Sequence, residues 1–75
     1  MEAATGKSMS LQRAREEAGL SRERLAELCG VTRAAVGHWE TGLHPASRGS
    51  RLLLAQALHV PVEVVDGWFE RREAA

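Results

Sequence analysis

The sequence predicts an all-α domain of five helices, and three observations support this fold class. Apolar residues recur at three- and four-residue steps along most of the chain, which is the spacing of a buried helix face. Serine, threonine or proline precedes these runs and glycine follows three of them, as expected at helix ends. No second strand is evident that could pair into a sheet. With 75 residues, the chain has room for one domain with a modest core.

The first helix is expected over residues 8–18, after a patternless start at residues 1–7 that we expect to be disordered. Gly19 is expected to end this helix, because glycine adopts the left-handed conformation of a helix terminus without steric cost. The apolar residues of its buried face are Leu11, Ala14 and Ala18.

Residues 21–42 carry the most informative pattern in the chain. Ser21 and Thr32 are each placed to cap a helix, and Gly30 and Gly42 are each placed to end one. The apolar stripes of these two helices are Leu25, Ala26 and Leu28, then Ala35, Val36 and Trp39. Two short helices joined by a glycine-containing turn are the arrangement of a DNA-binding helix-turn-helix, whose second helix enters the major groove.

The fourth helix is expected over residues 47–58, with Ser47 as its cap and a loop containing Pro45 before it. We expect Leu53 to point outward. His59 follows the helix, at a position where a left-handed cap favours glycine or asparagine. The residues expected on the buried stripe are Leu52, Leu54, Ala55 and Leu58.

A fifth helix is expected from Pro61, whose missing N–H is not needed in a first helical turn. The residues that recur there at helical steps are Val62, Val65, Trp68, Phe69 and Arg72. The β-branched run at residues 60–65 also fits an edge strand, and we favour a helix because four helices precede it. The domain is therefore expected to span residues 8–72, with a tail at 73–75.

The formal net charge is zero, with 10 basic and 10 acidic residues. A domain that binds phosphates is usually basic, so this balance predicts weak non-specific binding to DNA. The charges are unevenly placed, because residues 31–60 are basic and contain all three histidines, whereas residues 61–75 are acidic.

Composition argues against several other classes of protein. No apolar run approaches the ~18 residues of a membrane span and no signal segment opens the chain, so we expect a cytoplasmic protein with no membrane contact. The single cysteine, Cys29, fits a reducing compartment and is expected to be a core thiol. Catalytic sets, phosphate-binding glycine loops and metal-ligand spacings are missing, so we expect no enzyme activity, cofactor or metal.

Five blocks of the sequence, in this order and at this spacing, resemble the phage-repressor/Cro (XRE-type) helix-turn-helix family. They are Arg15 with residues 18–21, then residues 25–28, 30–32, 36–42 and 54–58. The resemblance extends over about residues 11–66. It implies a five-helix lambda-repressor-like helix-turn-helix domain that binds double-stranded operator DNA, usually as a homodimer, and controls transcription.

The expected base contacts lie on the third helix, at Arg33, Ala34 and His38. A guanidinium near the start of this helix can bond both O6 and N7 of guanine, which favours Arg33. Ala34 fits a thymine methyl group or is a plain surface alanine. His38 matches a position where relatives often contact a base, and it is suited to donate to a base or to a phosphate, the alternative being a plain exposed histidine. Gly37 costs the helix about 1 kcal/mol relative to alanine, which suggests either close approach of the DNA or neutral drift.

The expected phosphate contacts are Arg22, Thr32, Ala35 and Arg48. Arg22 stands at a helix N-terminus, where backbone N–H groups also favour a phosphate, although relatives commonly have glutamine there. Thr32 is first a cap, and neighbouring N–H groups such as that of Ala35 are placed near phosphate. Arg48 either flanks the DNA backbone or is simply solvated.

The resemblance also implies that Arg15 and Glu40 form a buried ion pair between the first and third helices. Val64, Trp68 and Phe69 are expected to form the dimer interface, the alternative being that the two aromatic rings fold back onto the core. The sequence is also consistent with a function of another class. The same fold can serve as a protein-interaction module, such as an antitoxin that neutralises a toxin.

Overall fold

The computed structural model describes residues 10–74, with side chains from residue 10 to residue 69. This part of the chain forms five helices and no strand: α2 (Leu11–Glu17), α3 (Arg22–Cys29), α4 (Arg33–Thr41), α5 (Arg48–Leu58) and α6 (Val62–Ala74). The predicted all-α class is confirmed, and the run at 60–65 leads into a helix rather than an edge strand. The start at residues 1–7 lies outside the described residues.

Each of the first four helices begins at a hydroxyl cap. In every case the side-chain oxygen accepts the backbone N–H three residues further on, and the capping residues are Ser10, Ser21, Thr32 and Ser47. The first helix therefore begins at Leu11, later than the expected start at Ser8, because Ser10 is its cap. Ser8 lies outside the described residues.

A residue with left-handed backbone conformation follows each of these four helices. Gly19, Gly30 and Gly42 have φ angles of 75°, 68° and 85°. His59 ends α5 with a φ of 58°, and it is the one non-glycine residue with positive φ within the described chain. A side chain in this conformation carries a steric cost, so the expected strain at His59 is present.

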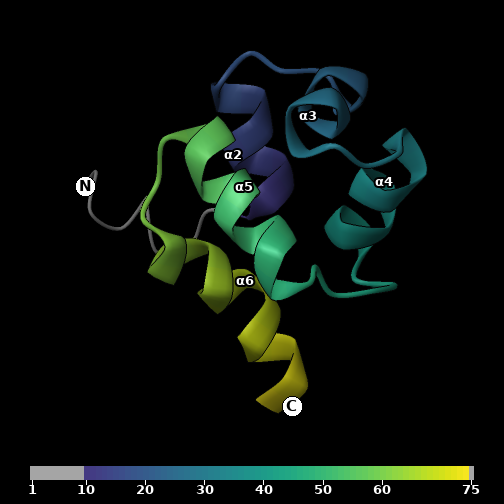
Figure 1. The fold of residues 1–75 in the computed structure, drawn as a ribbon. Coiled ribbons are helices and arrows are strands. Elements are labelled where there is room, and N and C mark those ends of the chain that lie inside the picture. The colour runs from purple at the N-terminus through teal and green to yellow at the C-terminus, as the bar shows by residue number, and fades with distance from the viewer. Residues whose placement is uncertain (1–9, 75) are drawn as a thin grey trace.

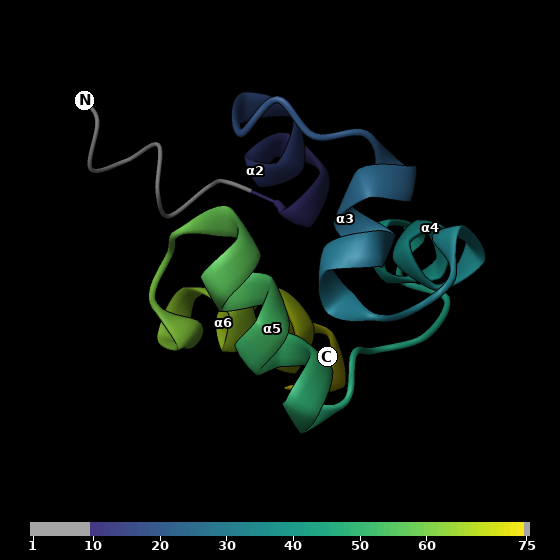
Figure 2. The ribbon, with the colours of Figure 1, turned by 45° about the horizontal axis from the view of Figure 1, so that its top comes forward.

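The helices enclose one core. In Figure 1, α5 runs through the centre of the molecule, with α2 behind it, α3 and α4 to one side and α6 below. Helices α3 and α4 cross at a steep angle. Figure 2 shows this crossing, with α4 nearly end-on while α3 lies across the view. The largest fully buried side chains come from α3, α4, α5 and α6, and they are Leu25, Val36, Leu54, Val65 and Phe69.

Two leucines expected in the core are exposed instead. Leu28 is 41% exposed and Leu52 is 45% exposed, so their assignment to the buried stripes was wrong. Leu28 lies beside the stripe of α3 rather than on it, because that stripe is formed by residues 25, 26 and 29. On α5, Leu52 shares the solvent face with Leu53, whose outward orientation is confirmed at 39% exposure.

The last helix, α6, extends to Ala74, beyond the domain end expected at residue 72. It contributes Val65 and Phe69 to the core. Among residues 10–74, none of the helices combines the length and apolar character needed to cross a bilayer.

Candidate nucleic-acid interface

One face of α4 is open to solvent. Arg33, Ala34 and His38 are exposed and Gly37 is half-buried, and these four positions share a helix face because they are spaced i, i+1, i+4 and i+5. The opposite face of the helix places Val36 in the core, with 0% exposure. The helix is therefore anchored on one side and presents a strip of mostly small residues on the other.

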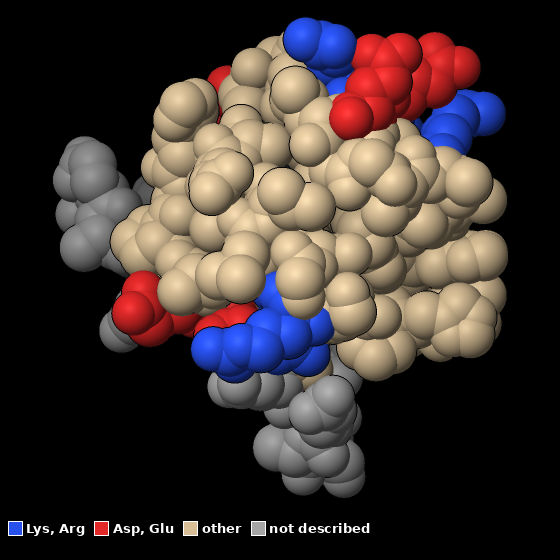
Figure 3. Space-filling view, viewed as in Figure 1, with Lys and Arg blue, Asp and Glu red and all other residues tan. Residues whose placement is uncertain are grey.

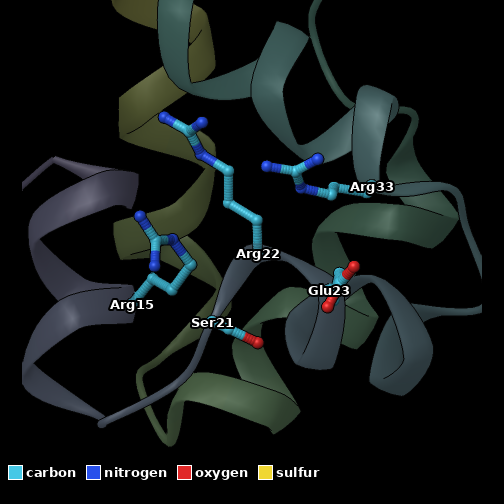
Figure 4. A pocket seen from close by; sticks show the side chains of 5 residues that line it. All are labelled: Arg15, Ser21, Arg22, Glu23 and Arg33. Carbon is cyan, nitrogen blue, oxygen red and sulfur yellow. The ribbon is translucent and has the colours of Figure 1, made fainter.

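A hollow of about 440 Å³ opens where α3 and α4 begin, and we call it the arginine hollow. Its lining residues are Arg15, Ser21, Arg22, Glu23 and Arg33. Figure 4 shows Arg22 and Arg33 extending to the same side of the two helix starts, with the Arg33 guanidinium pointing toward the Arg22 side chain. Three arginines against one glutamate give this hollow a surplus of positive charge, which suits an anion.

A second hollow of about 340 Å³ runs along the open face of α4, and we call it the α4 groove. It is lined by Arg22, Arg33, Ala34, Gly37 and His38. Arg22 and Arg33 line both hollows, so the two lie next to each other. The structure thus brings the three expected base-contacting residues together with the arginine expected at a phosphate.

A buried ion network lies beneath the arginine hollow. Arg15 Nε donates to Glu40 Oε2 at 2.6 Å, and Arg22 Nε donates to Glu40 Oε1 at 3.0 Å. Arg15 Nη1 also donates to the carbonyl oxygen of Leu20 at 2.8 Å. The Glu40 side chain is only 1% exposed, so both of its oxygens are paired where water does not reach. This network connects the start of α3 and the end of α4 to α2.

The second arginine of this network is not identifiable from the sequence pattern. Arg22 was assigned to phosphate alone, yet it also pairs with Glu40, 18 residues away in sequence. Its side chain remains 40% exposed, so part of the guanidinium faces solvent while Nε holds the carboxylate. The acidic residue Glu23 in the lining of the arginine hollow was likewise not anticipated.

The other residues expected at phosphates have different surroundings. Thr32 Oγ1 accepts the Ala35 N–H at 3.1 Å, so both of these groups serve the helix cap. Ala35 is partly buried against the core, and it offers no free N–H donor to a phosphate. Arg48 is exposed at the start of α5 and lines neither hollow, so the structure does not group it with Arg22 and Arg33.

The three residues expected at a dimer interface differ in exposure. Phe69 is 2% exposed and belongs to the core. Its ring therefore folds back onto the core, which was the alternative to a place in the dimer interface. Trp68 is half-buried and packs against the core, and Val64 is half-buried. Of these three residues, Val64 and Trp68 therefore keep part of their surface in solvent, whereas Phe69 does not.

Arg51 has a structural role that the sequence did not reveal. Its Nε donates to the Ala46 carbonyl oxygen at 3.0 Å, and its Nη1 lies 3.4 Å from Asp66 Oδ1. The guanidinium carbon also lies 5.2 Å from the centroid of the Phe69 ring, within the range of a cation–π contact. Arg51 thereby joins the loop before α5 to α6, rather than lying solvated on the surface.

Within the described part of the chain, no three ligand side chains are grouped so as to hold a metal ion. The single cysteine, Cys29, lies in the core at 3% exposure. Burial raises the pKa of the Cys29 thiol, because the thiolate is poorly solvated there. This environment disfavours the reactive, charged form.

Charged side chains are sparse on the face of the molecule that Figure 1 shows. In the space-filling view they gather at the upper and lower margins, whereas the surface over α5 and α4 carries few of them (Figure 3). The large apolar residues that are exposed in the described chain are Leu28, Leu43, Leu52 and Leu53.

Comparison with protein families gives one match. A family model described as a helix-turn-helix domain matches residues 9–68, which include α2 to α5 and the first half of α6. Comparisons with curated proteins and with solved structures give no match. A helix-turn-helix is a DNA-binding arrangement in which the first helix crosses the DNA backbone and the second enters the major groove. In this chain those helices are α3 and α4.

Proposed function

We propose that this chain, which belongs to the helix-turn-helix domain family, is a transcriptional regulator that reads double-stranded DNA with α4 in the major groove. The α4 groove is the observation that carries this proposal. It places a basic residue, two small residues and a histidine along one open face of the second helix of the motif. Such a face fits the major groove, where each base pair presents a distinct pattern of donors and acceptors.

Arg33 is the residue that we assign to base recognition. It is exposed, and its side chain makes no ion pair or hydrogen bond within residues 10–69. Its guanidinium is therefore available to bond O6 and N7 of a guanine without giving up an existing partner. Ala34 lies beside it for contact with a thymine methyl group, and His38 lies one helical turn further along.

Arg22 is the residue that we assign to a phosphate. It stands at the N-terminus of α3, where unpaired backbone N–H groups and the helix dipole also favour an anion. When Arg22 turns toward a phosphate, Glu40 keeps Arg15 as its partner at 2.6 Å. The buried Glu40 carboxylate therefore stays compensated by Arg15 after this exchange, so Arg22 is able to bind a DNA phosphate.

We extend the proposal to a homodimer on a two-fold operator. Each wrong base pair costs only ~1–3 kcal/mol, so one α4 with one strong base contact discriminates poorly among sequences. Two copies double the number of contacts and read half-sites about 34 Å apart, near one turn of DNA. The half-buried strip of Val64 and Trp68 on α6 is the surface that we assign to this contact.

Binding-site selection from a random duplex library, followed by fluorescence anisotropy on the selected site, tests the proposal. Arg33→Ala is expected to lose about 1–3 kcal/mol of affinity on that site and to relax the preference at one base pair. Arg22→Ala is expected to weaken binding to all sequences alike and to lower the salt dependence by roughly one counterion. Arg24→Ala is the matched control, because this exposed arginine on α3 pairs with Glu27 and lines neither hollow.

Two results would contradict these assignments. If Arg33→Ala binds the selected site as tightly as the parent, then α4 does not read bases through Arg33. If the library yields no enriched sequence and gel shifts at low and moderate salt show no complex, the chain does not act on duplex DNA by itself.

The exposed leucines favour a second candidate function, in which the same fold binds a partner protein. Leu28, Leu43, Leu52 and Leu53 are 39–62% exposed, and large apolar side chains left in water are available for contact with a partner protein. An antitoxin-like module would use such a face and tolerate the neutral net charge. The gel shift separates the two functions: a salt-sensitive complex with DNA supports the regulator, and its absence favours the protein-binding module.

A further inference from the structure

Two of the three histidines form a pair at the end of α4. The rings of His38 and His44 lie with their centroids 5.3 Å apart and their planes at 74°, in an edge-to-face arrangement. His38 comes from the last turn of α4, and His44 comes from the loop that leads to α5. Both residues are exposed, so the pair is a surface feature rather than part of the core.

Backbone hydrogen bonds hold the loop that carries His44 against α4. The carbonyl oxygen of His38 accepts the N–H of Gly42 at 3.0 Å and the N–H of Leu43 at 2.9 Å. The N–H of His44 points to the same oxygen at 3.5 Å, and the Thr41 hydroxyl donates to it at 3.3 Å. The two short bonds, from Gly42 and Leu43, fix the loop close to the helix, so the two rings meet because of the backbone geometry.

The charged groups that share the α4 groove with His38 are basic. His38 lines the α4 groove together with Arg22 from α3 and Arg33 from α4. Glu40, two residues further along α4, is directed inward to Arg15 and Arg22. Within residues 10–69, no carboxylate forms an ion pair with either imidazole. Both imidazoles are therefore open to an anion from solvent or from DNA.

We propose that His38 and His44 form a proton-dependent phosphate-binding pair, so that the affinity of this chain for DNA rises as the pair becomes protonated. The inference rests on the proposed function, because the phosphates are those of the DNA that α4 enters. It adds His44 to the contact surface and gives the site a form of regulation by pH. At zero net charge, two imidazolium groups would be a large addition to the positive charge of this face.

The direction of the effect follows from linkage. Histidine changes charge between pH 5 and pH 8, and a phosphate beside an imidazole favours its protonated form. DNA binding then takes up protons, and by the same linkage a higher proton concentration strengthens DNA binding. Affinity is therefore highest at low pH and falls as the pH rises.

Anisotropy titrations at constant ionic strength, with a duplex that carries the selected site, test this inference. The parent chain is expected to bind about threefold to tenfold more tightly at pH 6 than at pH 8. The double variant His38→Gln/His44→Gln is expected to lose this ratio, to less than about twofold. His59→Asn is the matched control, because it removes the third histidine, which lies at the far end of α5, with a residue that tolerates the left-handed backbone.

Each outcome has a separate meaning. A parent that binds the duplex with the same affinity at both pH values overturns the inference and leaves the proposed function intact. A parent that binds no duplex at either pH overturns both. If the double variant keeps the full ratio of DNA affinities between pH 6 and pH 8, the protons bind at other groups and the role of the pair is overturned. The same conclusion follows if His59→Asn loses this ratio.

A second measurement covers the case in which the double variant does not fold. The Cε1–H signals of the histidines are followed by NMR from pH 5 to pH 9, with and without the duplex, and assigned with single variants. The titration midpoints of His38 and His44 are expected to rise on DNA binding, while that of His59 stays in place. Unchanged midpoints for the pair in the complex would overturn the inference.

Discussion

At the scale of single residues, Glu40 determines how three helices meet. Its carboxylate is 1% exposed and receives one arginine from α2 and one from α3. The two contacts are unequal, because the Arg15 side chain is 10% exposed and also bound to the Leu20 carbonyl, whereas the Arg22 side chain is 40% exposed. The Arg15 contact is therefore structural, and the Arg22 contact is the one that we propose is exchanged for a phosphate.

The first prediction concerns this network. Glu40→Gln is expected to destabilise the domain by about 3–5 kcal/mol, because the buried Arg15 then keeps, for charge compensation, only a 3.9 Å contact with the half-exposed carboxylate of Glu16. Arg22→Ala is expected to cost at most about 1 kcal/mol, since its contact is partly solvated and Glu40 keeps Arg15. Urea unfolding followed by circular dichroism measures both free energies.

Arg13→Ala provides the control for this comparison. Arg13 pairs with Glu17 at 3.5 Å on the surface, where both side chains are more than half exposed. Its loss is expected to change the unfolding free energy by less than about 0.5 kcal/mol. If Glu40→Gln unfolds at the same urea concentration as Arg13→Ala, the network contributes little to stability.

The second prediction concerns Cys29. Because burial raises the pKa of its thiol and blocks access, its reaction with a soluble aromatic disulfide is expected to be at least about 100-fold slower in the native chain than in denaturant. The raised pKa also has a consequence for stability. The unfolded thiol ionises first, so the contribution of the protonated thiol is complete below the unfolded pKa and is lost as the pH rises through the folded pKa.

Cys29→Ser separates this effect from other alkaline changes. The parent is expected to lose more unfolding free energy than the serine variant between pH 8 and pH 10. Equal reaction rates in native and denatured protein would show instead that the thiol is open to solvent.

At the scale of elements, the helix ends were predictable and the buried faces were only partly so. Capping is local, because a hydroxyl acts on an N–H three residues away, and so Ser21, Thr32 and Ser47 could be identified from the sequence. In short helices, periodicity does not fix how wide the buried stripe is. Leu28 and Leu52 lie at stripe edges that the neighbouring helices do not cover.

Side-chain partners distant in sequence were not predictable without the fold. The pairing of Arg22 with Glu40 and of Arg51 with Asp66 joins residues 18 and 15 positions apart. Nothing in the local pattern distinguishes these arginines from solvated ones. The α4 strip could be predicted, since Arg33, Ala34 and His38 share a face by spacing alone, whereas the pairing of His38 with His44 depends on how the loop folds back.

The third prediction concerns Gly37 in the α4 groove. A Cβ at Gly37 would meet nothing within 4 Å, and the same holds at Gly49 on α5. Alanine at either position is therefore expected to stabilise the domain by about 0.5–1 kcal/mol, because glycine is unfavourable within a helix. If Gly37 serves close approach of the DNA, Gly37→Ala also weakens binding to the selected site by roughly 1–3 kcal/mol, comparable to a lost base contact.

Gly49→Ala is the matched control, with the same gain in helix propensity and no change in DNA affinity. Urea unfolding and anisotropy on the selected site measure the two quantities. A Gly37→Ala variant that is more stable and binds DNA as well as the parent would attribute this glycine to neutral drift.

At the scale of the whole molecule, the neutral net charge is the reason for which we propose a homodimer. The net charge is zero, and the arginine hollow contains a glutamate among its basic residues, so electrostatic attraction to DNA is modest. A single α4 groove offers one unpaired arginine for base recognition. A small neutral domain therefore gains usable affinity and specificity by doubling its contacts on a symmetric site.

The fourth prediction assigns this doubling to one strip of α6. Val64 and Trp68 are four residues apart and share a face, next to the face on which Val65 and Phe69 enter the core. Trp68→Ala is expected to weaken self-association at least about tenfold with the fold retained, since tryptophans dominate interface energies. Phe69→Ala is expected to cost about 3–5 kcal/mol of folding stability, as for a large side chain removed from a core, and so it does not probe the interface.

Sedimentation velocity at tens of micromolar, with and without the selected duplex, distinguishes this strip from the exposed leucines. Leu53→Ala is the matched control, because Leu53 is an exposed apolar residue on α5 rather than α6. If Leu53→Ala abolishes the dimer while Trp68→Ala keeps it, the interface includes the exposed leucine at position 53 rather than the α6 strip. A parent chain that sediments as a monomer both free and on DNA has no such interface, and its sequence preference then rests on one α4 groove and the phosphate contacts around it.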